Sequence, residues 1–169
     1  PDGLTRADPA RFFTYLYPKN DLMRARTVTL KQAMDEIIRK CQYCHVSMVD
    51  GEGKPYGLPF NFGYDGEYIY LHSAPEGKKI SILSQHPAVC VAFSTDHVLY
   101  HQSEKVACSY GMKYRSVLAY GEVEFIDNDD DKIPALNHIM RQYTGKADYS
   151  YNLPAVRNVK VYRVRISNM

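Results

Sequence analysis

The order of apolar and polar residues predicts two longer helices in this chain. In the first helix, apolar residues recur with a helical period at Leu30, Met34, Ile37, Ile38 and Cys41. Because Thr29 and Gln32 fit a capping box at its start, we predict a helix over about residues 29–41. The second helix is predicted over about residues 131–144 and ends at Gly145. Its apolar face consists of Ile133, Leu136, Ile139, Met140 and Tyr143.

Between these two helices the apolar period changes to two, which is typical of β-strands. Residues 45–49 alternate in this way and stop at the turn cluster DGEGKP. The stretches 56–64 and 67–73 flank the dipeptide Asp65-Gly66 and predict a hairpin. Further runs rich in β-branched and aromatic residues cover 88–94, 97–101, 105–110, 114–126 and 159–166. This pattern predicts a mainly β protein, an antiparallel six-stranded barrel with appended helices.

Chain length and composition indicate one globular domain. With 169 residues, the chain is long enough for a single core, which we place in residues 29–169 after an N-terminal arm at 1–28. The formal charge of +2 is too small to indicate a nucleic-acid or anionic-membrane partner. The longest apolar run, AVCVAF, is far shorter than the roughly 20 residues of a membrane helix. We therefore expect neither nucleic-acid binding nor a membrane span.

The expected compartment is the cytoplasm. The first residues, PDGLTRADPARFF, have no basic start, apolar stretch and small-residue cleavage site, so they do not resemble a secretory signal. Four cysteines in a chain of this length do not suggest a disulfide scaffold. We expect reduced thiols.

The stretch CQYCH at residues 41–45 has the spacing by which c-type haem is attached. It ends a predicted helix and opens a predicted strand, whereas a small c-type cytochrome is expected to be mostly helical. Cys41 continues the apolar helix face, and Cys44 serves as a small turn residue. No second CxxC pair is present, which disfavours zinc as well. We interpret the motif as structural and expect no metal.

A third helix is predicted after residue 73. Ser73 and Glu76 fit a capping box, and Pro75 suits a first helical turn. Lys78 and Lys79 then lie near the positive end of the helix dipole, which is unfavourable by about 0.3–1 kcal/mol for each cation. The pair is either a solvated pair of lysines or one half of a phosphate site.

Two stretches carry a resemblance to a known family. They are GLPFNFGYDGEYIYLHSAPEGKKISIL at 57–83 and GMKYRSVLAYGEVEFI at 111–126. Together they resemble the FMN-binding split-barrel family related to pyridoxamine 5′-phosphate oxidase, and most of all its nitroimidazole-resistance subgroup. The resemblance covers roughly residues 27–166, and in that family the CxxCH corner is not a haem site.

The resemblance implies FMN as cofactor and a homodimer with FMN at the interface. It implies that the segment Leu58, Pro59, Phe60, Asn61 and Phe62 runs along the flavin ring. It also implies that His72 and Ser73 lie beside the flavin, and that Lys78 and Lys79 bind its phosphate. Arg115 and Ser116 would reach the cofactor from the other subunit.

The function expected from this resemblance is that of an FMN-dependent oxidoreductase. Such a reductase passes electrons from a soluble donor, such as NAD(P)H, to a nitroaromatic, a nitroimidazole or a quinone. No GxGxxG motif follows a predicted strand, so the donor is expected to dock transiently. His72 is the candidate catalytic residue, as a proton donor or a group that positions the acceptor. The alternative for His72 is a strand-end histidine bonded to backbone.

Two alternative functions remain at the level of sequence. One is a non-catalytic flavin- or haem-binding protein, because a fold does not fix a function. The other is a pyridoxamine or pyridoxine 5′-phosphate oxidase-like enzyme. The family's B6 oxidases end in a segment built around tryptophan and arginine, whereas this chain contains no tryptophan.

Overall fold

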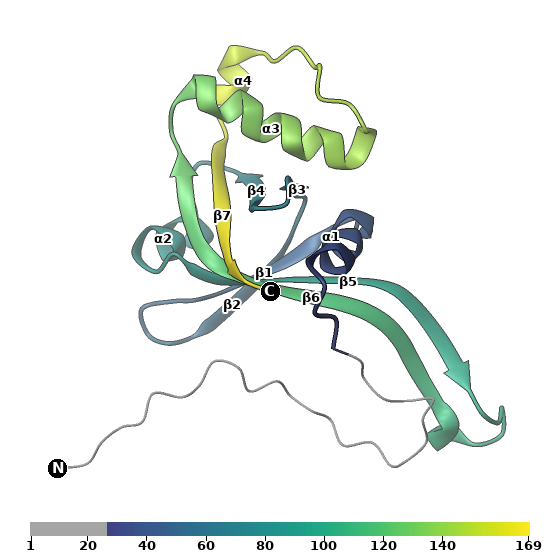
Figure 1. Cartoon of the computed structure of the whole chain (residues 1–169). Helices are drawn as coiled ribbons and strands as arrows, with labels where there is room; N and C mark the ends of the chain where they lie inside the picture. The colour runs from purple at the N-terminus through teal and green to yellow at the C-terminus, as the bar shows by residue number, and fades with distance from the viewer. Residues whose placement is uncertain (1–26) are drawn as a thin grey trace.

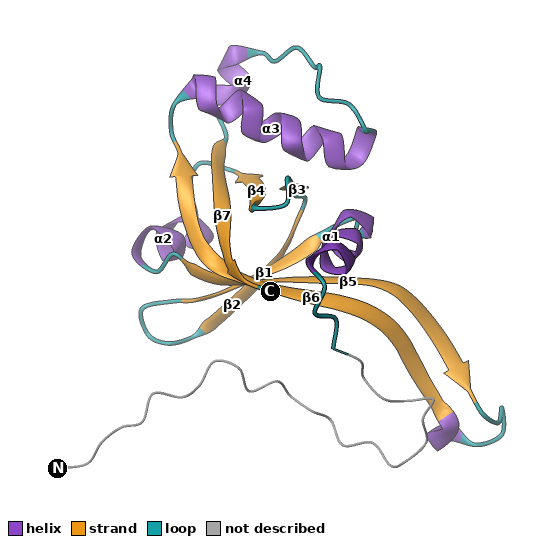
Figure 2. Cartoon of the chain, viewed as in Figure 1, coloured by secondary structure: helices purple, strands orange, loops and turns teal. Residues whose placement is uncertain are grey.

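The computed structural model of the protein describes residues 27–169, so most of the expected N-terminal arm lies outside the described residues. One antiparallel sheet of seven strands, in the order β2-β1-β5-β6-β7-β4-β3, forms the body of the molecule (Figures 1 and 2). The strands are β1 (Cys44–Val49), β2 (Pro55–Phe60), β3 (Gly63–Tyr64), β4 (Tyr68–Ser73), β5 (Ala88–His101), β6 (Tyr110–Ile126) and β7 (Lys160–Asn168). This architecture confirms the split barrel, with seven strands instead of six because β3 is a separate two-residue strand.

Four α-helices and one short 3₁₀ turn complete the part of the chain that the structure describes. They are α1 (Lys31–Lys40), α2 (Lys78–Gln85), α3 (Asp129–Thr144), α4 (Leu153–Arg157) and the 3₁₀ turn η1 (Ala107–Ser109). The predicted apolar face of α1 is confirmed at Ile37, Ile38 and Cys41, which are buried, but not at Leu30, which is 73% exposed. Its predicted capping box is wrong, because Leu30 is the N-cap and no side chain caps the helix. Within residues 27–169, no helix has the length and apolar character needed to cross a bilayer.

Both ends of α3 follow ordinary capping chemistry. The Asn128 side chain accepts a hydrogen bond from the Asp130 N–H and caps a helix that begins at Asp129, two residues before the predicted start. Gly145 ends the helix in the left-handed conformation at φ 72°, as the sequence predicts. The helix packs across β3 and β4, and a Cβ on Gly63 would lie 2.4 Å from the His138 carbonyl carbon. Only glycine permits this approach of helix to strand.

The predicted hairpin between residues 56 and 73 is only partly correct. Strand β2 pairs with β1 along its whole length, from the pair Cys44 and Phe60 to the pair Val49 and Pro55. Only Gly63 and Tyr64 pair with β4 across the Asp65-Gly66 turn. The sheet therefore begins at β2 and ends at β3, two strands that follow each other directly in the chain, and the barrel is split between them.

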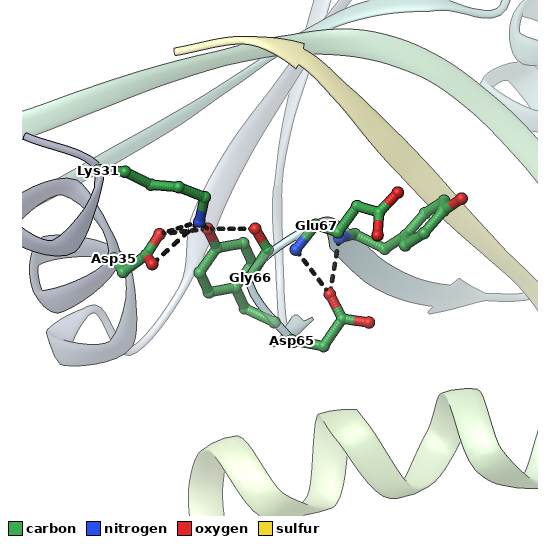
Figure 3. A network of polar contacts seen from close by, with 7 residues as sticks. Lys31, Asp35, Asp65, Gly66 and Glu67 are labelled. Carbon is green, nitrogen blue, oxygen red and sulfur yellow. Dashed lines mark hydrogen bonds and ion pairs between the residues drawn. The ribbon is translucent and has the colours of Figure 1, made fainter.

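A polar network joins α1 to the turn before β4 (Figure 3). The Tyr64 hydroxyl donates to Asp35 at 2.6 Å, and Lys31 Nζ donates to the same carboxylate at 2.9 Å. The Asp65 carboxylate accepts from the N–H groups of Glu67 and Tyr68, at 2.8 and 2.7 Å. Burial and the bond to Asp35 raise the pKa of Tyr64, so this tyrosine is a stable donor. The network fixes the turn from which β4 starts.

Strands β5 and β6 continue beyond the body of the molecule as a two-stranded ribbon (Figure 1). The runs predicted at 88–94 and 97–101 are one strand, bent at a bulge between Thr95 and Val98. Within this bulge Asp96 has a φ of 58° and binds both Lys40 and Arg115. The run predicted as a strand at 105–110 is instead the η1 turn, and β6 begins at Tyr110. The bulge is held by residues distant in sequence, which local patterns do not reveal.

Candidate functional site

A cavity of about 540 Å³ lies at the split in the barrel, between the end of β2, the end of β4 and the start of α2. We call it the β2–β4 cavity. It is lined by Leu58, Pro59, Phe60, Asn61, His72, Ser73, Ala74 and Lys79. Its size is typical of small-molecule sites, and its lining is divided evenly between apolar residues and residues with polar or charged side chains. The structure thus brings together residues of two segments that sequence analysis assigned to cofactor binding.

His72, which lines this cavity, has an unusual polar atom. Its Nδ1 is buried and has no hydrogen-bond partner within residues 27–169, so the expected alternative of a backbone-bonded Nδ1 is not observed. Burial lowers the pKa of His72 below its usual value. The ring is therefore mainly neutral at pH 7, and Nδ1 can still donate or accept one hydrogen bond.

The N-terminus of α2 faces the same cavity. Gly77 is its N-cap with a φ of 118°, and no side chain caps the helix. The predicted capping box is wrong, because the Ser73 hydroxyl donates to the Ala74 carbonyl at 2.9 Å and the helix starts only at Lys78. Residues 74–77 separate the end of the strand from the helix, and a capping-box pattern does not detect such a connection. The free N–H groups of the first turn therefore remain available to an anion.

The two lysines of α2 occupy different environments. Lys79 is half-buried and lines the cavity. Lys78 is exposed, and its Nζ lies 4.8 Å from the centre of the Tyr56 ring. Neither lysine forms an ion pair with another residue of the described part of the chain. Lys79 is thus the better placed of the two for a ligand in the cavity.

Phe62 lies outside the cavity. Its side chain is fully buried and contacts Phe93 edge to face, with ring centres 5.0 Å apart. Its N–H donates to the Tyr143 hydroxyl at 3.1 Å, and that hydroxyl donates to the Gln42 carbonyl at 2.9 Å. Sequence analysis placed Tyr143 on the apolar face of its helix but did not detect this polar role.

Arg115 and Ser116 also lie outside the cavity, on the part of β6 that leads into the ribbon. The Arg115 Nε donates to Asp96 at 2.6 Å, and Ser116 is paired with Ser94. Because successive strand residues point to opposite faces, the two side chains leave β6 in opposite directions. Their contact with a cofactor stays a prediction.

An exposed apolar surface adjoins the β2–β4 cavity. Pro59 is opposite His45, His45 opposite Ala92, and Ala92 opposite Leu118, so these four residues form one row on the outer face of the sheet. Alternate residues of β6 share this face. Leu118 and Tyr120 are 46% and 45% exposed, and Met112 and Tyr114 continue the face into the ribbon. We call this surface, formed by Met112, Tyr114, Leu118 and Tyr120, the β6 face.

A second cavity, of about 560 Å³, lies between α3 and strands β4, β6 and β7. The rings of Tyr70 and His138 stack on each other there at 4.4 Å. Arg163 forms an ion pair with Glu124 at 2.7 Å. Because these groups already bind one another, the cavity offers few free groups to a ligand.

The CQYCH corner is structural. Cys44 points into the core with 0% exposure, whereas the next residue, His45, is exposed on the opposite face of β1. Burial raises the pKa of Cys44 to about 12, so this thiol stays protonated. Residues 27–169 contain no group of three or more His, Cys, Asp and Glu side chains placed to hold a metal ion.

Comparison with known proteins gives the family context. A family model described as pyridoxamine 5′-phosphate oxidase matches residues 31–169. The crystal structure of a candidate 5-nitroimidazole antibiotic resistance protein from Bacteroides thetaiotaomicron is 44% identical, with a TM-score of 0.74, and the match covers 83% of this chain and 82% of that one. No curated protein sequence matches the chain.

Two more distant structures share the fold. The FAD and haem binding protein from Mycobacterium smegmatis is 19% identical with a TM-score of 0.71, covering 83% of this chain and 68% of that one. The flavocytochrome Anf3 from Azotobacter vinelandii is 18% identical with a TM-score of 0.68, covering 88% and 71%. At such identities the two structures support the fold alone.

Proposed function

Because the chain belongs to the pyridoxamine 5′-phosphate oxidase family, we propose that it is an FMN-dependent oxidoreductase that holds its cofactor in the β2–β4 cavity. One observation carries the proposal: residues 58–61 and 72–73 line a single cavity together with Lys79 at the N-terminus of α2. Apolar strand ends and a cationic helix start are the two environments that a flavin ring and a phosphate require.

The side chains and backbone groups of the cavity fit FMN. Leu58, Pro59 and Phe60 offer an apolar edge to a flat ring. The buried, unpartnered Nδ1 of His72 offers one hydrogen bond to a polar edge of a ligand. Lys79 and the uncapped first turn of α2 offer charge and N–H donors to a phosphate.

When bound, FMN would supply two-electron transfer from a soluble donor such as NAD(P)H to an electron-poor acceptor such as a nitroaromatic or a quinone. Lys79 and the first turn of α2 bind and orient the phosphate, and Phe60 excludes water from one side of the cavity. His72, neutral at pH 7, positions the acceptor by a hydrogen bond from its ring. A nitroimidazole is the acceptor we favour, because the relative that is 44% identical is described by resistance to that class.

We also propose a homodimer formed through the β6 face. This face is exposed, apolar and joined to the cavity by the row from Leu118 to Pro59. A second copy that covered it would bring its own β6 close to the cavity. Ser116 lies on this face, whereas Arg115 leaves β6 on the opposite face and would have to leave Asp96 and bend around the strand to reach a cofactor in the other copy.

Turnover by purified, FMN-loaded protein tests the enzymatic proposal. We expect NADPH-dependent loss of nitroimidazole absorbance, and slower turnover in His72→Gln with FMN still bound. Bound FMN without reduction of nitroimidazole or quinone would instead indicate a flavin carrier. Oxidation of pyridoxine 5′-phosphate would indicate the B6 alternative.

A further inference from the structure

Tyr162 of β7 is a second buried polar group without a partner. Its side chain is 0% exposed, and its hydroxyl has no hydrogen-bond partner within residues 27–169. The ring packs between Phe60 and Phe125, with ring centres at 6.3 and 5.7 Å. A phenylalanine would fill the same volume without burying an unpaired hydroxyl. The hydroxyl therefore requires an explanation other than packing.

Strand register places this hydroxyl beside the β2–β4 cavity. Tyr162 is opposite Leu71, and Ser73 is opposite Lys160, so Tyr162 and Ser73 are diagonal neighbours on one face of the sheet. Aromatic side chains reach such diagonal neighbours. Phe60, which contacts Tyr162, lines the cavity together with Ser73.

The chemistry of the two hydroxyls is complementary. Burial raises the pKa of Tyr162 to about 12, and the Ser73 side chain opposes part of that rise, so the phenol remains a proton donor near Ser73. Ser73 at present donates its only proton to the Ala74 carbonyl. Its oxygen can accept another hydrogen bond at the same time.

We propose that Tyr162 is a positioning residue for the phosphate of the cofactor and acts through Ser73. When Ser73 turns its proton from Ala74 to a phosphate oxygen, the Tyr162 hydroxyl donates to Ser73 Oγ and holds it in that orientation. This role rests on the proposed binding of FMN. In this role the unpaired Tyr162 hydroxyl gains Ser73 Oγ as its hydrogen-bond partner only when FMN is bound.

The test is titration of the flavin-free protein with FMN and with riboflavin, for the wild type, Tyr162→Phe, Ser73→Ala and the double variant. We expect Tyr162→Phe to weaken FMN binding about two- to tenfold and to leave riboflavin binding unchanged. In the Ser73→Ala background the same substitution should have no further effect. The control is Tyr64→Phe, which removes a buried hydroxyl bonded to Asp35 of α1; Tyr64 does not line the cavity, so this variant should not change the preference for FMN.

Melting temperature provides a second readout. Without flavin, Tyr162→Phe should melt no lower than the wild type, and saturating FMN should raise its melting temperature less. A lower melting temperature of the flavin-free variant, equal losses of FMN and riboflavin affinity, or independent effects of the two substitutions would overturn the role of Tyr162. If the wild type binds FMN and Tyr162→Phe keeps the full preference for it, only this role fails. If the wild type binds no FMN, the proposed function itself fails.

Discussion

At the scale of single residues, Lys79 has the largest expected effect on the cavity. A charge-assisted hydrogen bond to phosphate contributes about 1.5–3 kcal/mol, so Lys79→Ala should weaken FMN binding roughly ten- to a hundredfold. Lys78→Ala should have a smaller effect, since Lys78 lies over Tyr56 instead of lining the cavity. Riboflavin, which has no phosphate, should bind both variants as it binds the wild type.

Fluorescence titration of the flavin-free protein measures these affinities. Lys54→Ala is a matched control, because this exposed lysine binds Glu52 in the turn between β1 and β2. If Lys79→Ala keeps the wild-type preference for FMN over riboflavin, Lys79 is an ordinary solvated lysine and the phosphate binds elsewhere.

Two half-buried histidines predict how stability depends on pH. Burial lowers the pKa of His72 and of His138, so the folded protein binds protons less readily than the unfolded chain. The contribution of each histidine to the free energy of unfolding is complete above the pKa of about 6.5 that it has in the unfolded chain. This contribution is lost as pH falls from there toward the lower pKa of the folded protein.

Urea unfolding between pH 7.5 and 5.5 should therefore show a decreasing free energy of unfolding. His72→Gln and His138→Gln should each reduce the change in the free energy of unfolding per pH unit. A stability that rises as pH falls in this range, or a slope that neither substitution changes, is incompatible with neutral buried histidines.

At the scale of elements, Gly63 controls how closely α3 packs on the sheet. In Gly63→Ala the new Cβ would lie 2.4–2.5 Å from backbone atoms of His138 and Ile139, so helix and strand must separate. We expect the free energy of unfolding to fall by about 1–3 kcal/mol. Gly57→Ala is the control, because its Cβ would meet Ser47 Oγ at 3.7 Å and the Val46 carbonyl oxygen at 3.9 Å, both ordinary contact distances. Equal stability of the two variants in urea unfolding would show that α3 is not packed in this way.

The sequence predicts well those features that depend on local pattern. The apolar face of α1, the end of α3 at Gly145 and the strands of the barrel all follow from period and turn chemistry. The capping boxes at Thr29 and Ser73 fail because a four-residue pattern does not reveal where a connection ends and a helix begins.

Features that depend on contacts distant in sequence are not predictable in this way. Strand β2 pairs with β1 across the turn at 50–54, where the apolar pattern equally allowed pairing with β4, and only the full set of sheet contacts decides between the two. The same is true of the site. Segment 58–61 and Lys79 are predicted from the family resemblance and meet in the cavity, whereas the core position of Phe62 and the unpaired hydroxyl of Tyr162 follow only from tertiary packing.

At the scale of the whole molecule, the β6 face predicts the oligomeric state. Sedimentation should show a dimer for the wild type and a monomer for Leu118→Glu, because a charge on this apolar face disfavours contact between copies. Leu153→Glu is the matched control, since Leu153 on α4 has a similar exposure of 48% and lies outside the β6 face. A flavin-loaded monomer of the wild type, or a dimer of Leu118→Glu, would mean that this face is not the interface.

The binding of FMN by the wild-type protein tests the account most directly. Flavin-free protein is titrated with FMN and, separately, with riboflavin, and binding is followed by visible absorbance and quenching of flavin fluorescence. We predict one FMN per chain and an affinity for FMN at least about tenfold higher than for riboflavin, since the phosphate gains a charge-assisted contact at the start of α2. Absence of FMN binding, or equal affinity for the two flavins, would contradict a phosphate site at the β2–β4 cavity.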